Sequence, residues 1–173
     1  MIAAVSADWG IGKNNDLLFY IKEDLRRFKS LTLGNVVVMG HNTYKSLPER
    51  KPDDNLQPSG RALPGRKNIV LSSNITLQLH DAEVCNSLES LHEALKCYDS
   101  EKIFIIGGAQ IYRQLLPECT RAYITKVASS PAADVFFPDL DSLAEWKLTA
   151  EGDIKTQGGL IYRYVEYLNE GEI

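Results

Sequence analysis

LLFYIKEDLRRFKSLTL, residues 17–33, is an amphipathic stretch with one acid on its apolar side. At 100° per residue, its apolar side chains fall on one face of a helix and its basic side chains mostly on the other. Asp24 is the exception, because its direction lies between Phe28 and Leu31, whereas Glu23 points to solvent. A carboxylate among apolar side chains is unfavourable unless it is paired, protonated or offered to a ligand. The apolar face consists of Ile21, Leu25, Phe28, Leu31 and Thr32.

A simpler interpretation of Asp24 is an acid in the first turn, where a negative charge stabilises the helix dipole. Acids with a purely structural role outnumber functional ones, so this stretch alone favours the simpler interpretation. Gly34 suits the position that ends the helix. The remaining chain decides between the two interpretations of Asp24.

The length and composition predict one globular domain over residues 1–173. The chain is 44% hydrophobic and 24% charged, which suits one domain with a core and is too short for two ordinary ones. The formal net charge of −4 and the lack of a Lys/Arg block argue against a nucleic-acid partner. No apolar run has membrane-spanning length, and the N-terminus does not read as a signal peptide. We therefore expect a cytoplasmic protein with no membrane contact.

The cysteines and histidines give no sign of a metal centre. Three widely spaced cysteines fit a reducing cytoplasm, and neither they nor the three histidines have metal-ligand spacing. We therefore expect no metal. The residues are Cys85, Cys97, Cys119, His41, His80 and His92.

Strand and helix patterns alternate along the chain and predict an α/β fold. We expect about eight strands in a mixed, mainly parallel sheet, about four helices on both of its faces, and a C-terminal antiparallel hairpin. Ligands of such sheets bind at the carboxyl ends of the strands. The predicted strands are 2–7, 35–40, 68–71, 82–85, 102–106, 122–127, 146–150 and 160–168, and helices are predicted within 17–33 and at 41–47, 87–95 and 109–116.

Two stretches are predicted as loops, and two strand ends carry glycine. Residues 8–16 read as a mobile loop, and residues 48–62, with three prolines, as an extended surface loop. Gly40 and Gly107-Gly108 each stand between a strand and a helix, where bare backbone lets an anion approach closely. The second turn lacks the third glycine of the dinucleotide motif G-x-G-x-x-G, which excludes the ordinary Rossmann assignment.

Five separated motifs occur in the order of one known family: IAA…GIG within 2–12, IKEDLRRF at 21–28, VMGHNT at 38–43, LPGRKN at 63–68 and IIGGAQIY at 105–112. Over nearly its whole length the chain resembles dihydrofolate reductase of the bacterial type. The resemblance implies a dihydrofolate reductase-like fold. It also implies an oxidoreductase of tetrahydrofolate biosynthesis, which reduces 7,8-dihydrofolate to 5,6,7,8-tetrahydrofolate with NADPH.

The resemblance implies catalytic roles for Asp24 and Thr125. Asp24 matches the lone active-site acid, which bonds the 2-amino group and N3 of the pterin, and the Thr125 hydroxyl would support it. Hydride would pass from nicotinamide C4 to pterin C6. Because the family's acid lies too far from N5 to protonate it, water is the expected proton donor. We expect Asp24→Asn to lower the hydride rate severely near neutral pH while the protein still folds.

The resemblance also implies binding positions. Arg66 matches the arginine that forks onto the substrate's glutamate α-carboxylate, residues 8–17 match the lid over the nicotinamide, and Asp134 matches its distant support. Gly107-Gly108 matches the family's cis peptide pair. The implied substrate-binding residues are Ile2, Ala4, Leu25, Phe28, Leu47, Arg66 and Ile106. The implied cofactor-binding residues are Ala4, Ile11, Leu17, Gly40, His41, Asn42, Thr43, Leu71, Ser72, Ser73, Gly107, Gly108, Ala109, Gln110, Ile111 and Tyr112.

The chain departs from the family pattern at three places, one of which is the 48–62 loop, longer than the family norm. Leu18-Phe19 replaces the usual Pro-Trp, and a phenylalanine cannot donate a hydrogen bond to an ordered water. The positions that meet the cofactor 2′-phosphate hold His41, Asn42 and Gln110, which leaves less fixed positive charge than the usual arginines. The other groups available for the phosphate are Lys45, Ser72, Ser73 and the helix start at Asn42 or Thr43.

Two alternatives stay open. One is another pteridine or pyrimidine reductase of the same architecture, although Arg66 favours a glutamate-bearing substrate. The other is a non-catalytic nucleotide-binding module, in which Asp24 is a plain first-turn acid. A hydrolase has little support, because no nucleophile elbow occurs. We expect a monomer that binds dihydrofolate and antifolates such as trimethoprim or methotrexate.

Overall fold

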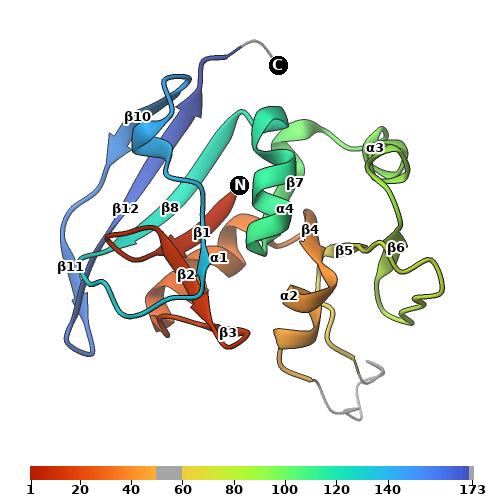
Figure 1. The fold of residues 1–173 in the computed structure, drawn as a ribbon, viewed down its shortest axis with the longest axis horizontal. Coiled ribbons are helices and arrows are strands. Elements are labelled where there is room, and N and C mark those ends of the chain that lie inside the picture. Colours follow the sequence, from red (N-terminus) through yellow and green to blue (C-terminus); the bar gives the residue numbers. More distant parts are fainter. Residues whose placement is uncertain (50–59, 172–173) are drawn as a thin grey trace. The chain divides into compact units, whose positions relative to one another are not determined.

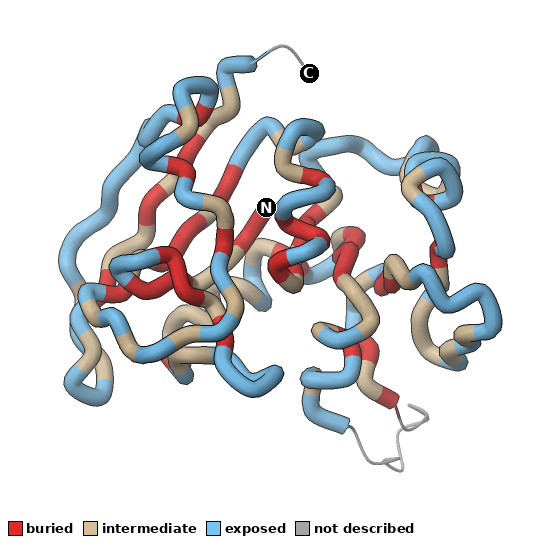
Figure 2. The backbone as a smooth tube through the Cα atoms, viewed as in Figure 1, coloured by how far each residue is buried: buried red, intermediate tan, exposed pale blue. Residues whose placement is uncertain are grey.

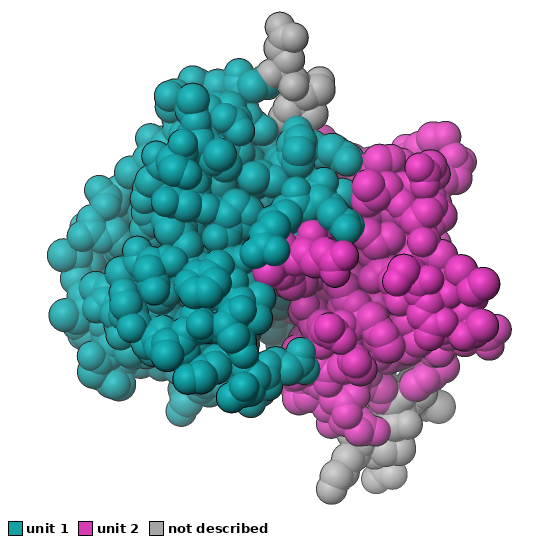
Figure 3. Space-filling model, viewed as in Figure 1, with its two compact units in different colours: residues 1–30, 112–173 teal, residues 31–111 magenta. Residues whose placement is uncertain are grey.

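The structure is a computed structural model that describes residues 1–49 and 60–171 (Figure 1). Most of the predicted surface loop at 48–62 lies outside the described residues. The chain divides into two compact units, shown in different colours in Figure 3. Unit 1 comprises Met1–Ser30 and Tyr112–Ile173, and unit 2 comprises Leu31–Ile111. A single domain over residues 1–173 therefore stays a prediction.

The main sheet of unit 1 is mixed and follows the order β1-β8-β12-β10, with β11 also paired to β12 (Figure 1). Strand β1 runs parallel to β8, and β12 runs antiparallel to β8, β10 and β11. The predicted C-terminal antiparallel pair is therefore confirmed. The strands are β1 (Ile2–Val5), β8 (Arg121–Val127), β10 (Trp146–Glu151), β11 (Lys155–Gln157) and β12 (Leu160–Asn169).

One row of residues across this sheet matters for the site. Ala4 of β1 is paired with Thr125 of β8, and Thr125 is paired with Tyr164 of β12. Directly paired residues in a sheet project their side chains to the same face. These three side chains therefore lie next to one another on one face of the sheet.

The predicted loop at 8–16 is wrong for about half of its length. Strands β2 (Gly10–Lys13) and β3 (Asp16–Leu17) form an antiparallel hairpin, and β9 (Val135–Phe136) pairs with the other edge of β2. Asn14-Asn15 forms the turn with φ of 52° and 65°. Two successive residues of positive φ are what a two-residue hairpin turn needs, and asparagine tolerates them.

Helix α1 (Lys22–Thr32) is shorter than the stretch in which it was predicted. Leu17 belongs to β3, and Ile21, just before the helix, is buried in a cluster with Val127 and Tyr162. Gly34 has φ of 77° after the helix, as expected for the residue that ends it. The helix therefore begins where an apolar side chain anchors the chain on the sheet of unit 1.

Unit 2 contains a parallel four-stranded sheet in the order β6-β5-β4-β7. Its strand β4 is buried along nearly its whole length (Figure 2). Side chains this apolar suit a strand covered on both faces. The strands are β4 (Val36–Gly40), β5 (Lys67–Leu71), β6 (Glu83–Cys85) and β7 (Ile103–Gly107).

Within the described ranges the α-helices number four, as predicted. Besides α1 they are α2 (His41–Ser46), α3 (Leu88–Leu95) and α4 (Ala109–Leu115). Among these residues, no helix combines the length and the apolar character needed to cross a membrane. Single 3-10 turns are η1 (Ser100–Lys102), η2 (Leu116–Glu118) and η3 (Leu140–Ser142).

Candidate active site

Asp24 lies in the first turn of α1 and is bonded to the sheet of unit 1. The buried Thr125 hydroxyl donates to Asp24 Oδ1 at 2.5 Å. Burial raises the pKa of Asp24, while the Thr125 hydrogen bond and the positive charge of Arg27 act in the opposite direction. The two residues with predicted catalytic roles are thus in direct contact. The acid is partly buried and its pKa is raised, a combination that is common at functional sites.

Ile21, the residue before α1, has no side-chain oxygen that could cap the helix. Contacts from the distant hairpin of β11 and β12 hold the first turn of α1 instead. The Glu23 N–H donates to Gln157 Oε1 at 3.2 Å. Lys155 Nζ donates to Glu23 Oε1 at 2.7 Å, and the Tyr162 hydroxyl donates to Glu23 Oε2 at 3.0 Å. The Glu23 side chain is 46% exposed, so it reaches solvent as expected, but it is also bonded to two partners that the sequence did not indicate.

Sequence reasoning missed these partners of Glu23 because they lie more than 130 residues away along the chain. No local pattern links Lys155, Gln157 and Tyr162 to the helix. One signal in the sequence was the apolar Ile21 before α1. It cannot accept hydrogen bonds from the first helical N–H groups, which indicates that another part of the chain supplies an acceptor. These contacts attach the first turn of α1, which carries Asp24, to β11 and β12.

The segment 8–17, which the resemblance matches to a lid, is anchored at its hairpin turn. Asp134 accepts a hydrogen bond from the Asn14 N–H at 2.8 Å, and the Asp134 N–H donates to Gly12 O at 3.1 Å. Trp9 is 7% exposed, and its ring stacks on Phe137. The contacts of Asp134 agree with its expected role as a support for this segment.

The other predicted site residues of unit 1 lie on several elements. Phe19, at the usual tryptophan position, packs against the Ile21 cluster. The buried Tyr112 donates its hydroxyl to Ile2 O at 2.8 Å, and Leu17 is 69% exposed. Of the rest, Ile2 and Ala4 lie on β1, Ile11 lies on β2, and Leu25 and Phe28 lie on α1 and are partly buried.

Two glycine-containing turns of unit 2 lie side by side. A Cβ at Gly108 would lie 3.2 Å from Thr43 Oγ1, and one at Gly40 would lie 3.0 Å from Ile111 Cγ1. Side chains at these glycines would therefore crowd the space between the β4–α2 and β7–α4 turns. The Gly107-Gly108 peptide bond is cis, as the resemblance implied. Bare backbone in two neighbouring turns fits a dinucleotide phosphate group.

The remaining predicted cofactor residues surround these turns. The Ser72 hydroxyl accepts a hydrogen bond from the Asn74 N–H at 3.2 Å, and the His41 ring stacks on Tyr44. Asn42, Ser73 and Gln110 are exposed, and Leu71 ends β5. Ala109 and Ile111 lie in the first turn of α4 and are buried.

Arg66 is held by its own unit. Its Nε donates to Thr32 Oγ1 at 2.9 Å and its Nη1 donates to Pro64 O at 2.8 Å, while burial lowers the pKa of its guanidinium. Asn68 bonds both the N–H and the carbonyl of Leu63, which fixes the turn that carries Arg66. A guanidinium oriented in this way suits a carboxylate ligand. Two further predicted substrate residues of unit 2, Leu47 and Ile106, are partly buried.

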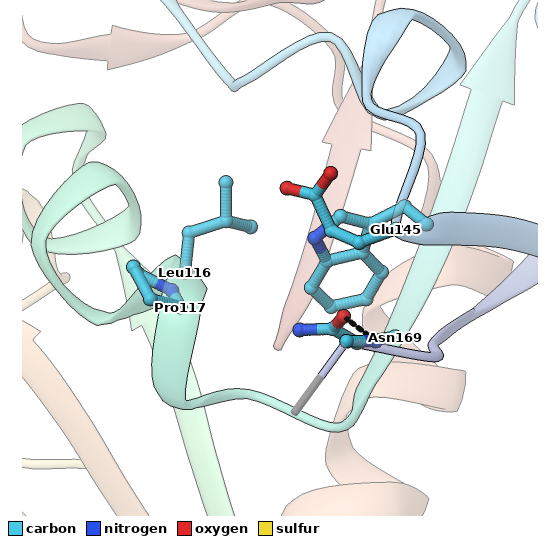
Figure 4. A pocket seen from close by; sticks show the side chains of 6 residues that line it. Leu116, Pro117, Glu145 and Asn169 are labelled. Carbon is cyan, nitrogen blue, oxygen red and sulfur yellow. Dashed lines mark hydrogen bonds between the residues drawn. The ribbon is translucent and has the colours of Figure 1, made fainter. Parts of the chain in front are cut away.

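A small cavity of about 190 Å³ lies elsewhere in unit 1 (Figure 4). It borders Asn169, which lies five residues beyond Tyr164 on β12, a distance of about 17 Å along a strand. None of the predicted site residues lines the cavity, so we do not assign the site to it. Its lining residues are Leu116, Pro117, Glu145, Trp146, Asn169 and Gly171.

Comparison with known proteins decides the family. The family model for dihydrofolate reductase matches residues 1–169. The chain belongs to the dihydrofolate reductase family. It is an enzyme of this family, as the motifs predicted. Within the described ranges, no group of three or more His, Cys, Asp and Glu side chains is arranged to hold a metal ion.

Individual relatives of the dihydrofolate reductase family match most of the chain. Dihydrofolate reductase of Neisseria meningitidis serogroup A is 38% identical over 169 residues, which cover 97% of this chain and 96% of the relative. Dihydrofolate reductase type 3 of Salmonella typhimurium is 39% identical over 143 residues, or 83% and 80% of the two chains. A solved structure of dihydrofolate reductase from Enterococcus faecalis, complexed with NADP(H) and RAB-propyl, has a TM-score of 0.79 at 27% identity. The match covers 98% of this chain and 95% of that one, which confirms the predicted fold class.

Proposed function

We propose that this chain reduces 7,8-dihydrofolate to 5,6,7,8-tetrahydrofolate with NADPH. The observation that carries the proposal is Asp24, a partly buried carboxylate with a raised pKa that the Thr125 hydroxyl holds on an otherwise apolar helix face. Family membership and the NADP(H) complex of the Enterococcus faecalis relative support the same reaction. Together, the partly buried Asp24 and the membership in this family make oxidoreductase chemistry the best-supported function.

In this proposal Asp24 binds and orients the pterin. A carboxylate accepts two hydrogen bonds side by side, which matches the adjacent N3 and 2-amino donors of the pterin. The Thr125 hydroxyl occupies one lone pair of Asp24 Oδ1, so the other lone pair of Oδ1 and the whole of Oδ2 stay available to the two pterin donors. Asp24 keeps the pterin oriented and influences its electron distribution, and water delivers the N5 proton.

We assign the glutamate tail of the substrate to Arg66. Its guanidinium is oriented by Thr32 and Pro64, and a fixed planar donor recognises the glutamate α-carboxylate better than a lysine would. The apolar surroundings of the pterin and its aromatic linker come from partly or fully buried side chains. These are Ile2, Ala4, Leu25, Phe28, Leu47 and Ile106.

The residues around Gly40 and Gly107-Gly108 fit NADPH, because both turns present bare backbone where a Cβ would crowd the neighbouring turn. When bound, NADPH supplies the hydride that nicotinamide C4 transfers to pterin C6. His41, Asn42 and Gln110 offer little fixed charge to its 2′-phosphate, so the hydroxyls of Ser72 and Ser73 contribute. The segment 8–17, supported by Asp134, excludes bulk water during transfer.

The test is the loss of NADPH absorbance on addition of 7,8-dihydrofolate, repeated with NADH. Rapid, dihydrofolate-dependent oxidation of NADPH supports the proposal, and equal oxidation of NADH would keep the reaction but overturn the cofactor assignment. No oxidation of either would favour a related reductase or a non-catalytic nucleotide-binding module. Asp24→Asn serves as the control, since it should bind NADPH but turn over slowly.

Four finer expectations stay predictions. They are a cytoplasmic location, a single folding domain over residues 1–173, a monomer, and binding of the antifolates trimethoprim and methotrexate. The last two can be measured together. Light scattering during gel filtration should give the mass of one chain, and titration of tryptophan fluorescence should report antifolate binding that Asp24→Asn weakens.

A further inference from the structure

Three side chains from three elements of unit 1 surround Asp24, and one of them is a cation that the family comparison does not assign. Arg27 stands three residues after Asp24 on α1, so the two side chains are neighbours on the helix surface. Thr125 donates to Asp24 from β8. Tyr164 is paired with Thr125 and comes from β12.

Arg27 does not extend into solvent, as its place among the polar residues of the helix pattern suggested. Its guanidinium carbon lies 4.3 Å from the centre of the Tyr164 ring and 5.8 Å from the centre of the Tyr123 ring. Cations over aromatic faces at such distances are attracted by the ring, and more strongly so when they are partly desolvated. The sheet therefore holds this charge in one place, on the face that also carries Thr125.

The other charges near Asp24 neutralise each other. Lys155 of β11 pairs with Glu23 at 2.7 Å, and Tyr162 of β12 donates to the same carboxylate. The Tyr164 hydroxyl oxygen is buried, and the side chains of Asp24 and Arg27 are partly buried. Partial burial reduces the solvent screening between a held cation and a neighbouring carboxylate.

We propose that Arg27, seated on the ring of Tyr164, is a positioning residue that sets the pH at which Asp24 ionises and so the pH range of the reaction. The effect on the pH range of the reaction rests on the proposed function, whereas the effect on the ionisation of Asp24 does not. The neighbouring Arg26 provides a matched control, since it is exposed and carries the same charge on the same helix turn. A structural role of Arg27 would change stability without moving the ionisation of Asp24.

The decisive experiment is a carbon-13 NMR titration of aspartate carboxyl groups in the free protein, with the Asp24 signal assigned by its loss in Asp24→Asn. We expect Arg27→Gln to raise the pKa of Asp24, Arg26→Gln to leave it unchanged, and Arg27→Lys to return it toward the wild-type value. Equal shifts in the two glutamine variants, or a shift in neither, would overturn the proposal.

The contact between the Arg27 guanidinium and the Tyr164 ring is tested with Tyr164→Leu. The shift caused by Arg27→Gln should be smaller in that background than in the wild type, because Arg27 is then no longer held over the ring. Equal shifts in both backgrounds would overturn the role of Tyr164. Single-turnover hydride transfer over the same pH range should move with the NMR titration. If no dihydrofolate reduction is detected, the proposed function fails, while the titration still decides the role of Arg27.

Discussion

Thr125→Val removes the hydrogen bond to Asp24 with almost no change of shape. Thr125 is 1% exposed, and its hydroxyl lies 2.5 Å from Asp24 Oδ1. Valine fills the same volume, so the variant leaves no cavity and the loss comes from the hydrogen bond. A bond to an ionised group contributes about 1.5–3 kcal/mol, and a bond between neutral groups about 0.5–1.5 kcal/mol.

The two values predict a destabilisation that depends on pH. The pKa of Asp24 is raised above its ordinary value of 3.8 by burial, so in the folded protein Asp24 is protonated below pH 3.8 and ionised well above it. The variant should therefore lose about 2 kcal/mol of unfolding free energy at pH 7 and about 1 kcal/mol below pH 3.8. If the carboxylate loses its orientation as well, kcat/KM for dihydrofolate should fall by up to about 30-fold at pH 7.

Urea denaturation of the wild type and the variant between pH 3.5 and pH 8 measures this difference. Thr149→Val is the control, because the exposed Thr149 donates to the neutral carbonyl of Glu166 at 3.2 Å. Its effect on the unfolding free energy should be small and independent of pH. The reasoning is refuted if Thr125→Val destabilises equally at both ends of the range, or if the two valine variants behave alike.

The remaining predictions concern Asp24, Gln157 and Arg66. Burial of the ionised Asp24 opposes folding, so the stability of the wild type relative to Asp24→Asn should be highest below pH 3.8 and decrease as the pH rises through the folded pKa of Asp24. Chemical denaturation of both proteins checks this, and a fall in activity without this stability trend would mean that Asp24 is not buried as described. Gln157→Ala should lower the free energy of unfolding by about 1 kcal/mol, the usual value of a lost helix cap, whereas Gln78→Ala at an exposed position outside the helices and strands should change it little in the same denaturation experiment. Arg66→Lys should raise KM for dihydrofolate about tenfold and leave KM for a pteridine without the glutamate tail unchanged, because only the bidentate contact is lost. Equal effects on both substrates would remove Arg66 from the tail site.

Local patterns predicted those parts of the fold that depend on neighbours in sequence. The spacing within residues 17–33 placed Asp24 on the apolar side of its helix, and the structure has the Thr125 hydroxyl on that side. The helix predicted at 87–95 is present as α3, and Ser87 and Ser90 form reciprocal capping bonds at its start. The alternating runs near the C-terminus pair as β10 and β12.

Contacts between distant residues could not be predicted in the same way. The partner of Asp24 came only from the family resemblance, since 101 residues separate Asp24 from Thr125. The helical pattern placed Arg27 on the polar face, and nothing local indicates that two tyrosines of the sheet hold it. The hairpin of β2 and β3 was missed because its glycines suggested a loop, although Asn14-Asn15 is a two-residue turn signal.

The division of the chain into units gives an order in which its parts can form during synthesis. Unit 2 is one continuous piece of chain, so its parallel sheet has all its strands once the ribosome has released Ile111. Asp24 leaves the ribosome much earlier than Thr125, and Gln157 and Tyr162 follow later still. Asp24 therefore lacks its hydrogen-bond partner until β8 emerges, and the neighbouring Glu23 lacks the contacts of Gln157 and Tyr162 until β11 and β12 emerge. The nascent chain completes its candidate catalytic centre last.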